Sequence, residues 1–169
     1  MVQFTVHGPF DIPTYRGSVG RIVRAEEGRS FFKAHSVWAA RRGCYVFAMR
    51  AGGGITPTYV GRATKTFAQE CFTADKLCKC NQTLVDYARG TLVMFLLAAP
   101  TGRGRPAEKQ IKLLEDFLIQ VGVAANDELL NVKGTKQEQW ALTGIVRSAQ
   151  GRPSSAASSF KAAMKLGAR

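Results

Sequence analysis

The chain lacks the features that mark membrane-spanning and secreted proteins. Its longest apolar run, residues 92–99, is too short to cross a bilayer as a helix. The opening residues have neither the basic stretch nor the long apolar stretch of a secretory signal peptide. Four cysteines in 169 residues do not form the disulfide framework of a small secreted domain. We therefore expect a cytoplasmic protein with no membrane partner.

The sequence is also poor in groups that hold a structural zinc ion. Cys71, Cys78 and Cys80 offer three thiolates, but their spacings are not the C-x₂-C pairs of zinc sites. No histidine lies between Cys44 and the C-terminus to complete the set. Reduced, partly buried thiols are the expectation.

Acidic residues are scarce, with 12 Asp and Glu against 24 Lys and Arg, which gives a formal net charge of +12. Residues 1–50 carry 8 basic and 3 acidic groups, and residues 151–169 carry 4 and none, so most of the excess lies in the two flanks. Such a field favours a polyanionic partner, and nucleic acid is the first candidate. The alternative is that the charge serves solubility alone.

Apolar residues make up 46% of the chain, enough for a real core. We expect one main domain over residues 43–149, preceded by an extension (1–42) that packs on it and followed by a basic, Ser/Ala-rich tail (150–169). Within the extension, short β-like stretches precede a helix that Ser30 caps and Gly43 terminates.

Two runs rich in aromatic and β-branched residues, 44–49 and 58–61, flank a glycine-rich loop and predict a β-hairpin. The continuous apolar run of residues 91–99 predicts a strand covered on both faces. Helical patterns cover 64–87, with a break near Cys80, then the stretch from Pro106 to about Val121, and another from Thr135. The expected fold is therefore α/β (α+β), with a small, mostly antiparallel three-stranded central sheet flanked by helices.

Glu115 stands at the edge of the apolar stripe of the predicted helix after Pro106, between Ile111 and Ile119. A carboxylate in that position loses hydration and needs a cation, a metal ion or a proton. The simpler interpretation is a boundary glutamate that pairs with Lys112.

Four short motifs follow one another along the chain. They are Gly43-Cys44-Tyr45, Tyr59-Val60-Gly61, Glu115 with Leu118-Ile119, and Leu130-Asn131. This ordered set, over residues 43–131, resembles the GIY-YIG nuclease family, whose first two motifs lie on a hairpin and whose glutamate lies on a later helix.

The resemblance implies a metal-dependent endonuclease that hydrolyses DNA phosphodiester bonds. It assigns activation of the attacking water to Tyr45 and positioning of water or phosphate to Tyr59. Glu115 would hold one divalent ion, Mg²⁺ or Mn²⁺, Gly61 would permit close packing beside the site, and Asn131 would brace it. A carboxylate and several waters suit Mg²⁺.

Charge at the site follows the family pattern only in part. Arg62 stands where the family often has a basic residue and is a candidate catalytic group. The family's arginine on the first helix corresponds here to Gln69, an amide that binds phosphate without neutralising it. Lys65, Lys76 and Arg62 are candidates for the missing charge.

The same residues have other interpretations. Tyr45 and Tyr59 are also typical packed strand residues, and Asn131 is also a typical turn residue. Lys161 and Lys165 in the tail either contact phosphates or form a solvated face. The alternatives to an endonuclease are a catalytically impaired nucleic-acid-binding module and a basic protein-interaction domain.

Overall fold

A computed structural model describes residues 2–18, 20–101, 108–131, 133–134 and 154–164. The chain divides into two compact units, residues 1–135 and 136–169. The second unit contributes one described helix, α6 (Ser155–Ala163), which begins where the Ser154 hydroxyl accepts a hydrogen bond from the Ala157 amide. All other elements belong to the first unit.

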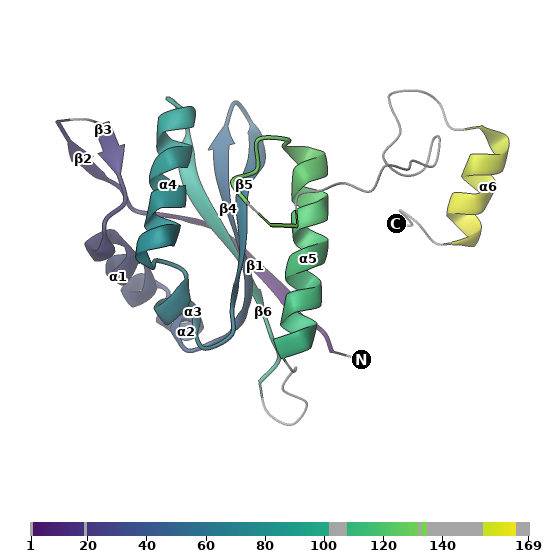
Figure 1. Cartoon of the computed structure of the whole chain (residues 1–169), viewed down its shortest axis with the longest axis horizontal. Helices are drawn as coiled ribbons and strands as arrows, with labels where there is room; N and C mark the ends of the chain where they lie inside the picture. Colours follow the sequence, from purple (N-terminus) through teal and green to yellow (C-terminus); the bar gives the residue numbers. More distant parts are fainter. Residues whose placement is uncertain (1, 19, 102–107, 132, 135–153, 165–169) are drawn as a thin grey trace. The chain divides into compact units, whose positions relative to one another are not determined.

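The first unit is built on a four-stranded antiparallel sheet (Figure 1). Its order is β1 (Thr5–Asp11), β6 (Thr91–Ala98), β4 (Gly43–Ala51) and β5 (Gly54–Ala63), so β1 and β5 are the edge strands. A separate small hairpin pairs β2 (Tyr15–Gly17) with β3 (Gly20–Ile22). The expectation of an α+β fold with an antiparallel sheet is confirmed.

The expectation of three strands is wrong, because β1 from residues 1–42 adds a fourth. Gly8 and Pro9 interrupt the strand pattern in its middle, and the register with β6 shifts between His7 and Phe10. Most of β1 is exposed. Part of the segment expected to pack on the domain therefore belongs to its sheet.

Helices cover both faces of the sheet (Figure 1). On one face, α1 (Ala25–Ala34), α2 (Ser36–Ala39), α3 (Phe67–Glu70) and α4 (Ala74–Asp86) enclose the main core cluster with the inward side chains of β4, β5 and β6. On the other face, α5 (Glu108–Ala125) packs on Cys44, Val60 and Leu97. The strand at 91–98 is buried on both faces, as its apolar run predicts.

The hairpin of β4 and β5 fixes the register on which the site depends. Gly52 and Gly53 make the turn with positive φ angles of 58° and 83°. Tyr45 lies opposite Gly61 and Phe47 opposite Tyr59, with a register shift just beyond Phe47. The two tyrosines therefore share the face covered by α1–α4.

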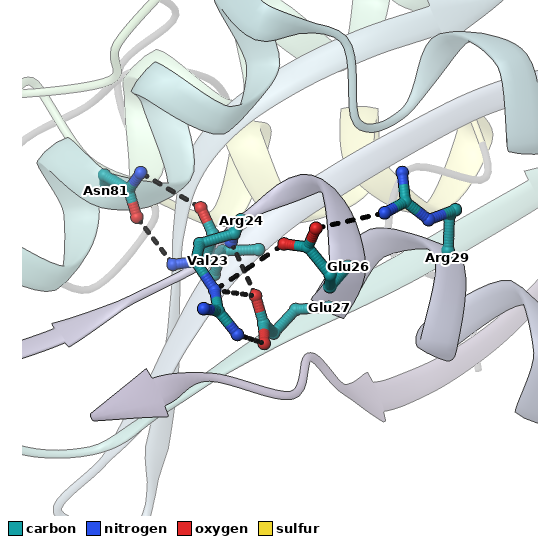
Figure 2. A network of polar contacts seen from close by, with 6 residues as sticks. All are labelled: Val23, Arg24, Glu26, Glu27, Arg29 and Asn81. Carbon is teal, nitrogen blue, oxygen red and sulfur yellow. Dashed lines mark hydrogen bonds and ion pairs between the residues drawn. The ribbon is translucent and has the colours of Figure 1, made fainter. Parts of the chain in front are cut away.

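The first helix begins five residues before the expected Ser30 cap, at Ala25. The Glu27 carboxylate accepts hydrogen bonds from the Arg24 amide (2.9 Å) and guanidinium, which closes the first turn (Figure 2). The hydrogen bond from Arg24 holds the pKa of Glu27 down at about 2, against an opposing effect of burial. Asn81 binds both backbone groups of Val23 and so fastens α4 to the segment before α1.

The helical stretch of residues 64–87 breaks at 71–73 rather than near Cys80, so α4 runs through that cysteine. The helix expected after Pro106 is α5, and it continues to Ala125. The helix expected from Thr135 lies outside the described residues. Within the described parts of the chain, no helix combines the length and the apolarity that a bilayer crossing requires.

Candidate functional site

A cleft of about 780 Å³ lies beside the edge strand β5, between α4 and α5. A smaller cavity of about 370 Å³ shares four residues with it: Tyr59, Arg62, Lys76 and Glu115. These four side chains come from three elements far apart in sequence. They mark the junction of the two cavities.

Arg62 and Glu115 form the ion pair at this junction. Arg62 Nη1 donates to Glu115 Oε2 at 3.0 Å, and the Glu115 side chain is 18% exposed. Burial raises the pKa of Glu115, although the Arg62 guanidinium acts in the opposite direction. Lys112 does not pair with Glu115, because its ammonium contacts Asp116 at 2.6 Å. The half-buried carboxylate has Arg62 as its cation partner.

Tyr59 and Lys76 form the second contact of the junction. The Tyr59 side chain is largely buried and lies at the cleft margin, and the Lys76 ammonium sits 5.1 Å from the centre of its ring. Burial opposes the charge on Lys76, but its hydrogen bonds to Asp75 and Tyr59 outweigh burial and raise its pKa. Lys76 therefore stays protonated next to the phenol of Tyr59.

Tyr45 does not reach the cleft. Its side chain is fully buried, and its hydroxyl has no hydrogen-bond partner among the described residues. The ring lies beneath Gly61, where a β-carbon would fall 2.5 Å from the Tyr45 hydroxyl. Burial raises the pKa of Tyr45 far above its usual range. Gly61 permits the expected close packing, but it does so by covering the first tyrosine.

Asn131 braces β5 at the residue between Tyr59 and Gly61. Its Oδ1 accepts from the Val60 amide (2.9 Å) and its Nδ2 donates to the Val60 carbonyl (2.8 Å). The neighbouring Leu130 amide donates to the Thr58 carbonyl at 2.8 Å. The segment after α5 thus pairs with the open edge of β5 beside the cleft.

The remaining predicted residues lie away from the junction. Gly43 has a φ of 148°, and a β-carbon there would clash with the Leu97 carbonyl, so the start of β4 requires glycine. Gln69 is exposed, and its side chain bonds the Thr66 hydroxyl in the first turn of α3. Lys65 is exposed and borders neither cavity.

The structure describes the side chain of neither predicted lysine of the tail. The backbone of Lys161 belongs to α6, and its side chain falls outside what the structure describes. Lys165 lies outside the described residues altogether.

Four charged residues that line the cleft were not predicted from the sequence: Asp75, Lys79, Asp116 and Lys133. The signal for Lys79 was its spacing, because residues three apart on a helix share a face and Lys76 precedes it by three. The same spacing relates Lys112 to Glu115. Lys133 lies after α5 in no helix or strand, and nothing in its sequence position marks it.

Most of the charged residues that line the larger cavity form ion pairs. Three acids each have a cation within salt-bridge distance: Glu115 with Arg62, Asp75 with Lys76, and Asp116 with Lys112. The other charged residues of its lining, Lys79 and Lys133, form no ion pair among the described residues, although Lys79 helps to lower the pKa of Asp75. The cleft therefore carries a surplus of two positive charges.

The fit of a metal ion depends on Glu115. Among the described residues, no group of three His, Cys, Asp or Glu side chains gathers as a metal cage. Arg62 occupies Oε2 of Glu115, and no described residue bonds Oε1. A carboxylate oxygen that no described residue bonds, in a residue that lines the cleft, fits an ion such as Mg²⁺, which keeps several of its waters.

The cysteines behave as separate thiols. Cys44, Cys71 and Cys80 are buried, Cys78 is exposed, and all four are free. Cys44 packs as a small apolar residue against Ile111, and burial raises its pKa to about 12. In the described part of the chain, these cysteines do not gather with other ligands into a group of three.

We compared the chain with protein-family models, with curated proteins and with solved structures. None of the three comparisons finds a match.

Proposed function

We propose that the chain is a divalent-metal-dependent endonuclease that hydrolyses DNA phosphodiester bonds at the junction of the two cavities. One observation carries the proposal: Tyr59, Arg62, Lys76 and Glu115 border both cavities. A phenol, a carboxylate and two cations are the groups that this reaction needs in one place.

Each of the four has a chemical task at a phosphodiester. Arg62 and Lys76 offset the negative charge of the phosphate, and the guanidinium also donates hydrogen bonds in a fixed geometry. Tyr59 orients the attacking water or a phosphate oxygen through its hydroxyl. Asn131 holds the strand that carries Tyr59 and Arg62 in place.

Glu115 would hold the divalent ion, Mg²⁺ or Mn²⁺, through its carboxylate. When bound, the ion stabilises charge on the phosphate and on the leaving oxygen. Burial favours this role, because a partly desolvated carboxylate gains more from a nearby cation than an exposed one does.

Tyr45 has a supporting task in this proposal. Its ring lies 6.3 Å from the ring of Tyr59 and 5.4 Å from that of Phe47, centre to centre. It holds the hairpin face rigid beneath Gly61, and we assign the contact with water to Tyr59 alone.

A second candidate is a nucleic-acid-binding module that does not cleave. Two observations favour it: the Gln69 amide bonds Thr66 rather than facing the cleft, and the Tyr45 hydroxyl is buried. Such a module would use the positive surplus of the cleft and leave the Arg62–Glu115 pair intact.

Nicking of supercoiled plasmid distinguishes the two candidates. With Mg²⁺ or Mn²⁺ the protein should nick, and EDTA should stop it. Glu115→Gln should lower the rate by about 100-fold or more while DNA binding persists. Asp116→Asn is the matched control, since this neighbouring acid lines the same cleft but pairs with Lys112.

Three outcomes decide between the candidates. Equal losses in Glu115→Gln and Asp116→Asn would refute the assigned role of Glu115. A protein that binds DNA but never nicks it is the second candidate. A protein that does not bind DNA is neither.

A further inference from the structure

Two lysines of the larger cavity stand apart from the ion pairs of the cleft. Lys79 comes from α4 and Lys133 from the segment after α5, so they approach the cavity from different elements. Neither has a carboxylate within salt-bridge distance among the described residues. An ammonium group that is not held in an ion pair is available to an anionic ligand.

The two cavities differ in the charges that they add to the junction. Beyond the four shared residues, the smaller cavity adds Glu70 and Thr73, and the Oε1 atom of Glu70 accepts from the Lys65 amide. The larger cavity adds three cations, Lys79, Lys112 and Lys133, against two acids, Asp75 and Asp116. The net positive charge therefore lies on the side of the junction that the larger cavity occupies.

We propose that the DNA phosphates on one side of the cleaved bond lie in the larger cavity, held between Lys79 and Lys133. The inference rests on the proposed function, because it takes the junction as the point of cleavage. The smaller cavity, which adds a carboxylate, does not receive this flanking strand. The two lysines are positioning residues, and they bind phosphate without base readout.

The physical consequence is measurable as salt dependence. Each phosphate that a lysine neutralises releases condensed counterions, so the logarithm of the binding constant falls with the logarithm of salt concentration by about 0.9 per contact on duplex DNA. A solvated lysine outside the cleft contributes no such contact. Removal of the two cleft lysines should flatten the slope, and removal of two others should not.

The test is fluorescence anisotropy of a short labelled DNA duplex, titrated in EDTA over a series of salt concentrations. The cleft variant is Lys79→Gln with Lys133→Gln. The matched control is Lys33→Gln with Lys109→Gln, which removes the same charge from two exposed positions that border neither cavity. Thermal unfolding of both variants confirms that they fold.

The cleft variant should bind more weakly, with a slope shallower by about 0.9 for each lysine, while the control keeps the wild-type slope. An unchanged slope in the cleft variant, or equal flattening in the control, overturns the inference. Because EDTA removes the metal, binding is scored apart from cleavage. If the salt slope flattens in the cleft variant but the wild-type protein never nicks plasmid, phosphate binding by Lys79 and Lys133 stands and the proposed hydrolysis is rejected. If the protein does not bind DNA, both proposals are rejected.

Discussion

Substitution of Tyr45 by phenylalanine should stabilise the protein, although Tyr45 is the tyrosine of the first motif of the site. The Tyr45 hydroxyl is buried and has no partner among the described residues. An unpaired buried hydroxyl costs about 1–3 kcal/mol, and phenylalanine removes it while the ring keeps its packing. We expect Tyr45→Phe to raise the free energy of unfolding by about 1 kcal/mol.

Urea unfolding measures this change as a higher midpoint at an unchanged slope. In a thermal scan the same gain corresponds to about 2–4 °C for a chain of this size. Tyr59→Phe is the matched comparison, because Tyr59 borders the cleft and its hydroxyl has a partner, Lys76. Tyr59→Phe removes a hydrogen bond to Lys76, so it should lower stability slightly and reduce plasmid nicking, whereas Tyr45→Phe should retain nicking.

Two results would refute this reasoning. A loss of stability in Tyr45→Phe would mean that the hydroxyl has a hydrogen-bond partner in solution. Loss of nicking in Tyr45→Phe at wild-type stability would mean that this hydroxyl, and not that of Tyr59, serves the reaction.

Three further predictions concern the supports of the site and the fold. Asn131→Ala removes two hydrogen bonds to Val60, so the free energy of unfolding measured in urea should fall by about 1–3 kcal/mol. The Val60 amide should also exchange its hydrogen faster. Equal exchange in the variant and the wild type would contradict the bracing role. Because the hydrogen bond from Arg24 lowers the pKa of Glu27 from 4.5 to about 2, its stabilisation is present above pH 4.5 and is lost as the pH falls through about 2. The free energy of unfolding of Glu27→Gln should therefore change less with pH in the acid range than that of the wild type. An equal change with pH in both proteins would exclude this ion pair as a source of the pH dependence. A thiol reagent should modify Cys78 rapidly and the other three cysteines only after unfolding; rapid modification of more than one thiol in the native protein would contradict the burial.

The hairpin and the central strand were predictable because their patterns are local. Alternating aromatic residues around a glycine loop define β4 and β5, and a continuous apolar run defines β6. A β-like stretch was expected at the start of the chain, but its extent and its place in the main sheet were missed, because Gly8 and Pro9 interrupt the pattern of β1 and its side chains are mostly exposed. Its pairing with β6 is a long-range contact that no local signal carries.

The candidate site was predictable in its residue types more than in its geometry. Spacing alone placed Glu115 at the edge of a helix stripe, and the structure gives it a cation from β5 instead of from its own helix. The burial of Tyr45 depends on the register of the hairpin and on the helices above it. A one-residue shift would reverse which side chains face those helices, so sequence periodicity could not decide it.

The asparagine that binds Val60 has a consequence for the protein at high concentration. An uncovered edge strand offers a row of amides and carbonyls onto which a strand of another molecule can add. Here the residues after α5 satisfy the outer groups of Thr58 and Val60 from within the same chain. Asn131 thus protects against self-association as well as supporting the cleft, and its loss would expose a template for intermolecular β-sheet growth.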